Sequence, residues 1–97
     1  MELFFTRAHS KDLASLKSLV SERVAHWASR YPQLDLASHY RWRDERTAVG
    51  SYRGGEGTVT LGEREVTVKL ELPFFARPFK GKIEGFVNRE LDEALRA

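Results

Sequence analysis

The chain has 97 residues, of which 41% are hydrophobic and 11% aromatic, which suits one packed domain and excludes extended disorder. The absence of cysteine excludes a disulfide scaffold or a thiolate metal site and fits a reducing cytoplasm. The net charge of +2 permits contact with anionic surfaces without identifying a nucleic-acid binder. No apolar run approaches the roughly 18–20 residues of a membrane span, and "MELFFTRAHSK" lacks the signal-peptide pattern, so we expect a cytoplasmic protein.

The first 32 residues predict a strand followed by a helix. Residues 2–9 alternate as a strand, with Leu3 and Phe5 on one face. Ser10 is the predicted N-cap of a helix over residues 11–30, and Asp12 adds negative charge at its start. Pro32 ends the helix, because the residue before a proline avoids helical angles. The apolar stripe of this helix comprises Leu13, Leu16, Val20, Val24, Trp27 and Tyr31.

The middle of the chain changes to the alternation of strands. Residues 39–45 place Tyr40 and Trp42 on the core side and Arg41 and Arg43 opposite, which favours a half-buried strand over a base-stacking surface. Residues 47–53 predict the next strand, and "GGEG" at 54–57 predicts a turn. Residues 58–62 form another strand, a turn follows at 62–64, and residues 66–72 form the clearest strand of all.

A final helix completes the predicted fold. Pro78 is predicted in its first turn, and its apolar stripe comprises Phe79, Ile83, Phe86, Val87, Leu91 and Leu95. Short connections make the four later strands an antiparallel meander, with the first strand at an edge or beside the last. Two helices on one sheet face give a single two-layer α+β domain over residues 1–97, in the order β-α-β-β-β-β-α, like a reduced helix-grip fold.

The sequence lacks the patterns of catalytic and metal sites. His9, His26 and His39 lie in different elements and form no HExxH motif. The serines lack a GxSxG context, and "GGEG" is not followed by GK[ST]. Asp92 and Glu93 fit the solvated side of the final helix. We therefore expect no catalytic residue, no metal and no cofactor, and we predict that the protein is neither an enzyme nor a nucleic-acid binder.

The stretch "LPFFARPFKGKIEGF" at 72–86 carries the candidate binding residues. Phe74, Phe75 and Phe79 either close the open end of the core or form an apolar docking surface. Around them Arg77, Lys80 and Lys82 lie near a helix start, where cations oppose the helix dipole and can meet an anionic surface.

Two glycines interrupt the final helix. Gly81 and Gly85 each cost about 1 kcal/mol relative to alanine in a helix interior. Close packing of the helix on the sheet is the favoured explanation, and a close contact with a partner helix is the alternative.

The segment "RPFKGKIEGFVNRELDEAL", residues 77–95, resembles the carboxy-terminal signature of the polyhydroxyalkanoic acid system family. Looser matches are R-x-H-S at 7–10 and Tyr-x-Trp at 40–42, and Phe74 and Phe75 stand where leucines are expected. The resemblance implies a small bacterial protein associated with polyhydroxyalkanoate synthesis or storage, and it supplies no catalytic residues.

Three functional hypotheses follow. The first is a non-enzymatic accessory protein that binds the polyhydroxyalkanoate granule or its protein coat, with Phe74, Phe75 and Phe79 for apolar contact and Arg77, Lys80 and Lys82 for anionic contact. The second is a small carrier of an acyl or hydroxyacyl ligand, held between sheet and helix. The third is a self-associating or partner-binding module, such as a homo-oligomer.

Overall fold

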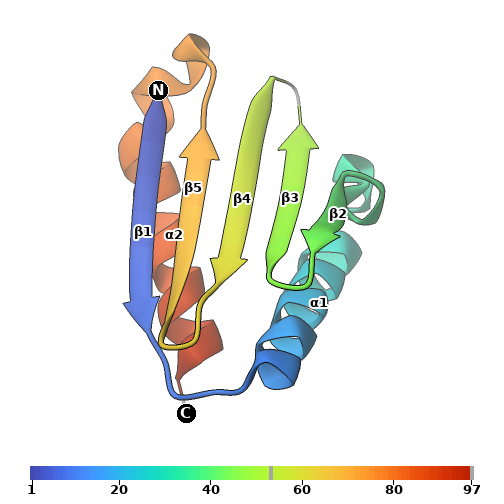
Figure 1. Ribbon diagram of the computed structural model, residues 1–97. Coiled ribbons are helices and arrows are strands. Elements are labelled where there is room, and N and C mark those ends of the chain that lie inside the picture. Colours follow the sequence, from blue (N-terminus) through green and yellow to red (C-terminus); the bar gives the residue numbers. More distant parts are fainter. Residues whose placement is uncertain (53, 97) are drawn as a thin grey trace.

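The computed structural model, which describes residues 1–52 and 54–96, consists of one antiparallel sheet with two helices on one face (Figure 1). The strand order is β1-β5-β4-β3-β2, so β1 is an edge strand and also the neighbour of the last strand. This arrangement confirms the predicted fold class and element order. The elements are β1 (Glu2–Ala8), α1 (Leu13–Arg30), η1 (Pro32–Leu34), η2 (Leu36–Ser38), β2 (Tyr40–Asp44), β3 (Thr47–Tyr52), β4 (Gly55–Leu61), β5 (Glu65–Glu71), η3 (Phe74–Phe79) and α2 (Lys80–Leu95).

Helix α1 begins at Leu13, two residues later than its predicted start at residue 11. The N-cap is Asp12 rather than Ser10, and the Asp12 carboxylate accepts a 2.7 Å hydrogen bond from the backbone N–H of Ser15. This bond holds the pKa of Asp12 below its ordinary value. Both residues fit a cap by type, and the actual start depends on which one places its oxygen near an unpaired amide.

The core lies between the helix-bearing face of the sheet and the two helices. Alternate residues of β1 and β5 face it, and in the register Leu3 pairs with Leu70 and Phe5 with Val68. Leu16 of α1 and Leu61 of β4 are almost fully buried. The residues packed against this cluster include Leu13, Leu19, Val20, Trp42, Val59, Leu72, Ile83, Val87, Leu91 and Leu95. The predicted apolar stripes of both helices therefore face the sheet over most of their length.

The opposite face of the sheet carries no helix (Figure 1). Phe4 lies on this face with 63% of its surface exposed, and the Nζ of Lys69 is 5.9 Å from the centre of its ring. An exposed phenylalanine outside residues 72–86, on the open face of the sheet, is therefore available as a reference.

The β3–β4 turn is tighter than the sequence predicts. Strand β4 begins at Gly55, because Gly55, Glu56 and Gly57 pair with the end of β3 instead of forming the turn. Gly54, with a φ of 84°, supplies the left-handed backbone that a turn requires. The predicted end of the preceding strand, at residue 53, lies outside the described residues. At the preceding turn, the Arg46 N–H donates to Asp44 Oδ1 at 2.9 Å and holds the pKa of Asp44 below its ordinary value.

Candidate functional site

The phenylalanine segment forms a short 3₁₀ helix between the sheet and α2. Pro73 precedes it with a φ of −65°, and the N–H of Ala76 donates to the Pro73 carbonyl at 3.0 Å. Pro78 lies inside this 3₁₀ helix, so the prediction that it occupies the first turn of the last α-helix is wrong. Helix α2 starts at Lys80, whose N–H bonds to the Arg77 carbonyl.

The three phenylalanine rings of this segment are exposed. Phe74, Phe75 and Phe79 expose 84%, 63% and 54% of their surfaces, and the first two contact each other edge to face, with centroids 6.2 Å apart. Burying such a ring stabilises a fold by roughly 1.5–3 kcal/mol, which these rings largely forgo. Exposure of this extent contradicts closure of the core as their role. We call these three rings, together with Arg77, Lys80 and Lys82, the phenylalanine corner.

The cations of the phenylalanine corner lie among its rings. Arg77, Lys80 and Lys82 are exposed, and none forms an ion pair with another described residue. The first turn of α2 contains no acidic residue, and its start has no side-chain cap. The corner therefore combines exposed apolar rings with positive charge that no carboxylate in the described chain neutralises.

The two glycines of α2 lie on the side of the helix that faces away from the sheet. Gly81 and Gly85 are exposed, and a Cβ added at either position would meet nothing within 4 Å. The favoured prediction, close packing of this helix side on the sheet, is wrong, since the helix packs through the opposite side that carries Ile83 and Val87. A contact with a partner helix stays a prediction.

A feature that the sequence analysis missed is an apolar cleft between the two helices, with a volume of about 640 Å³. Val24 and Trp27 of α1 form one wall, and Phe86 of α2 forms the other. The centroids of the Trp27 and Phe86 rings are 5.1 Å apart, so these side chains join the two walls. Phe86 is 41% exposed and, unlike Ile83 and Val87 of the same stripe, is not packed against the buried core cluster.

The floor of the cleft includes two strand positions that carry no side chain. Gly50 of β3 and Gly57 of β4 are paired in register, on the face that carries the helices. The next pair on the same face is Ala48 and Val59, and there side chains fill the space between the sheet and the helices. The glycines leave space where two side chains would otherwise meet the helices. Their spacing in the sequence, on core-facing positions of neighbouring strands, is the signal that could have predicted the cleft.

An ion pair crosses between the helices at the inner end of the cleft. The Arg23 Nε and one terminal nitrogen donate to both oxygens of Glu90, at 2.7–2.9 Å, and both side chains are partly buried. Arg23 lines both the cleft and a smaller apolar cavity of about 230 Å³ beyond it, which Glu90 also lines. Glu93 lies 3.9 Å from the same terminal nitrogen of Arg23, so the pair marks the boundary between the two spaces and two carboxylates face one guanidinium there.

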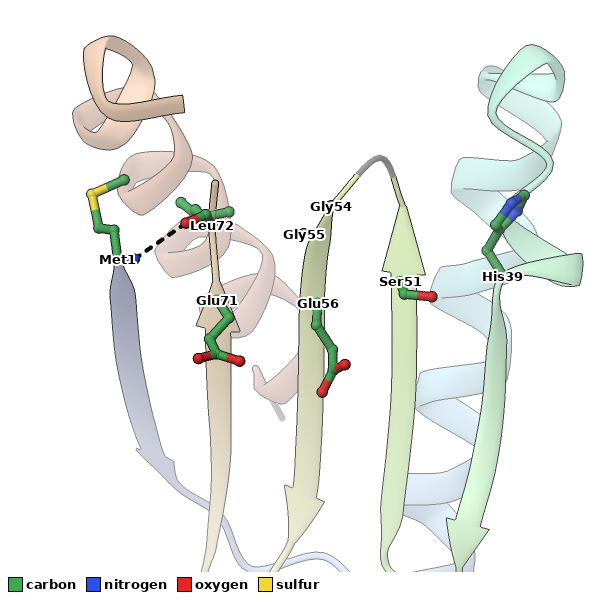
Figure 2. A pocket seen from close by; sticks show the side chains of 8 residues that line it. All are labelled: Met1, His39, Ser51, Gly54, Gly55, Glu56, Glu71 and Leu72. Atoms are coloured by element: carbon green, nitrogen blue, oxygen red, sulfur yellow. Dashed lines mark hydrogen bonds between the residues drawn. The ribbon is translucent and has the colours of Figure 1, made fainter. Parts of the chain in front are cut away.

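A polar notch at the end of the sheet adjoins the cleft through shared lining residues, and Figure 2 shows the residues of the notch. The notch has a volume of about 550 Å³ and shares Ser51, Glu56 and Leu72 with the cleft. Glu56 and Glu71, which pair in register on β4 and β5, place two carboxylates side by side there. Because side chains alternate along a strand and Gly57 and Leu70 face the helices, both carboxylates lie on the open face of the sheet, outside the cleft.

His9, His26 and Asp92, which the sequence analysis considered as possible site residues, make ordinary contacts with neighbouring groups. His9 Nε2 is 2.8 Å from the Gly62 carbonyl and its Nδ1 accepts from the Lys11 N–H. His26 is exposed and contacts Trp27 edge to face. Asp92 bonds to Arg7 at 2.9 Å at the surface. Across residues 1–52 and 54–96, no group of His, Cys, Asp and Glu side chains could hold a metal ion.

Two classes of feature thus define the protein: an α+β sheet–helix domain with an exposed aromatic corner, and an apolar cleft floored by glycine. Residues 3–95 match the model of a family described as "putative polyhydroxyalkanoic acid system protein", and the chain belongs to this family. No curated protein and no solved structure matches the chain, so the likeness to a helix-grip fold stays a prediction. Within the described residues, neither helix is long and apolar enough to cross a membrane.

Proposed function

We propose that the protein is a non-enzymatic accessory protein of polyhydroxyalkanoate storage, which binds the surface of the polyester granule or its protein coat through the phenylalanine corner. The observation that carries the proposal is the exposure of Phe74, Phe75 and Phe79 within one short 3₁₀ helix. Membership of the polyhydroxyalkanoic acid system family supports the storage context.

The chemistry of the corner suits an apolar surface that carries some negative charge. Rings that leave water on docking contribute roughly 1.5–3 kcal/mol each, part of which offsets the loss of translational freedom. Arg77, Lys80 and Lys82 add attraction to anionic groups at such a surface, and salt screens this attraction. The rings therefore supply most of the affinity, and the cations adjust its strength and its salt dependence.

The test is co-sedimentation of the purified protein with polyhydroxyalkanoate granules, using protein-stripped granules, coated granules and anionic liposomes in parallel. Binding to stripped granules but not to liposomes supports direct contact with the polymer. Binding only to coated granules places the contact on a coat protein. The absence of binding to all three surfaces contradicts the proposal.

A matched pair of variants assigns the binding to the corner. The double variant Phe74→Ser/Phe75→Ser should lose most of the binding while its unfolding temperature stays near that of the wild type. Phe4→Ser is the control, because Phe4 is as exposed as Phe75, at 63%, but lies on the open face of the sheet. Equal loss of binding in both variants points to nonspecific adsorption, and unfolding of the double variant means that the rings support the core.

A further inference from the structure

We propose that the apolar cleft between α1 and α2 is a binding site for a free, unbranched, uncharged aliphatic acyl ester. This site does not rest on granule docking, because none of its lining residues belongs to the phenylalanine corner. Three properties of the cleft carry the assignment: its shape, the two glycines of its floor, and the lack of an unpaired lysine or arginine among its described lining residues.

The shape indicates a single small ligand. A volume of about 640 Å³ lies within the range of small-molecule sites, and the walls and floor are apolar, from Trp27, Phe86 and Leu70 among others. The wall that α1 contributes runs from Arg23 to Tyr31, about 12 Å at 1.5 Å per residue, which suits an extended chain of roughly eight to ten carbons. The ion pair of Arg23 and Glu90 crosses at the inner end, so a short chain end fits better than a continuous polymer.

The glycine floor favours a narrow, unbranched chain. Strand interiors disfavour glycine, yet Gly50 and Gly57 face each other at the bottom of the cleft. A Cβ at Gly57 would lie 3.1 Å from Leu70 Cδ2, so even one methyl group crowds the floor there. At Gly50, an added Cβ meets only backbone and Cβ atoms at 3.4–3.9 Å, which a fold tolerates. Gly50 is therefore the position at which the cleft can be filled with the least damage.

The charges favour an uncharged head group. Among the described residues that line the cleft, Arg23 is the only lysine or arginine, and it is already paired with two carboxylates, Glu90 at 2.7 Å and Glu93 at 3.9 Å. A free carboxylate in the cleft would find no unpaired cation and would be repelled by the carboxylates around Arg23, whereas an ester presents only acceptor oxygens. Ligands of equal length should therefore bind more tightly as methyl esters than as free acids, and salt should narrow the difference by screening.

The test is a titration of the protein with methyl hexanoate, methyl octanoate and methyl decanoate, and with the matching free acids, below their aggregation concentrations. The chain has two tryptophans, and Trp42→Phe leaves Trp27 in the cleft wall as the only indole reporter. We expect saturable one-to-one binding that tightens by about fourfold per added methylene, with the ester ahead of the acid. Absence of saturation, no dependence on length, or tighter binding of the acids overturns the assignment.

Variants locate the ligand. In the Trp42→Phe background, Gly50→Val should weaken binding by about tenfold or more, because its side chain occupies the floor. The control is Thr58→Val, which also introduces a valine but on the face of β4 that points away from the helices. This variant should bind the ester with the affinity of the parent protein. If Gly50→Val does not fold, Phe86→Ala replaces it, since this wall residue is 41% exposed and its loss leaves the core intact. Unchanged affinity in the folded floor or wall variant overturns the site.

Discussion

Replacement of Gly85 by alanine should stabilise the protein, although a glycine at this position suggests a packing requirement. Gly85 lies in the interior of α2, is exposed, and has open space where a Cβ would be. Alanine is favoured over glycine in a helix interior by about 0.8–1 kcal/mol, and no clash opposes this gain. We therefore expect Gly85→Ala to raise the free energy of unfolding by nearly the full propensity difference.

The expected shift is large enough to measure. For a domain of this size, 1 kcal/mol corresponds to an increase in unfolding temperature of roughly 4–8 °C. In urea, with a slope of about 2 kcal/mol/M, the midpoint should rise by about 0.5 M. Circular dichroism during thermal and urea unfolding measures both quantities, and an unchanged urea slope shows that the shifted midpoint reports a change in stability.

Two other glycines are the controls for this reasoning. A Cβ at Gly62 would lie 2.8 Å from the Glu65 carbonyl oxygen, and Gly54 has a φ of 84°, so alanine at either position should destabilise the fold. An unchanged or lowered unfolding temperature in Gly85→Ala would refute the argument, since it would mean that this side of α2 is already packed against something in the protein, such as a second copy.

Three further changes test the rest of the fold. Leu16→Ala should lower the free energy of unfolding by about 2–5 kcal/mol, because Leu16 is only 2% exposed, and a loss below 1 kcal/mol in urea titration would mean that the core is poorly packed. Glu90→Gln should lower the free energy of unfolding by roughly 1–2 kcal/mol, a value between those of exposed and buried ion pairs. In a double-mutant cycle with Arg23→Met, most of this loss should appear as coupling energy between the two residues. Asp12→Ala should destabilise at neutral pH; because the folded pKa of Asp12 is lowered, its contribution is present above 3.8 and disappears as the pH falls through the folded value, so the two unfolding curves should converge in acid.

The periodicity of the sequence was sufficient to predict most of the fold. Alternation in residues 66–72 predicts β5 because one face of the sheet is buried and the other is not, and steps of three and four predict the helices for the same reason. Helix ends were less predictable, since Ser10 and Asp12 are both good caps by type. At 54–57, glycine composition suggested a turn, whereas cross-strand pairing with β3 extends β4 to Gly55.

The candidate sites show where sequence patterns no longer suffice. A run of phenylalanines beside prolines has the same composition whether the rings close a core or face water, so the exposure of Phe74 depends on where η3 ends relative to the sheet. The cleft depends on two facts that appear only in three dimensions: Gly50 and Gly57 are register partners, and the helices stand on either side of them. In the sequence, each glycine taken alone indicates only a residue that is unfavourable in a strand interior.

The two proposed sites lie at the same end of the sheet but differ in charge, because the cations of the phenylalanine corner have no carboxylate partner among the described residues, whereas Arg23 of the cleft has two. Leu72 lines the mouth of the cleft, and the chain continues from it through Pro73 directly into η3. Because the cleft is short and its inner end is crossed by an ion pair, it should hold a free ester while the phenylalanine corner contacts a surface. Saturating methyl octanoate should therefore leave granule co-sedimentation unchanged, and Phe74→Ser/Phe75→Ser should keep its affinity for the ester. Displacement from stripped granules by the ester would instead mean that the polymer itself enters the cleft, which would contradict the assignment of a free ester as its ligand.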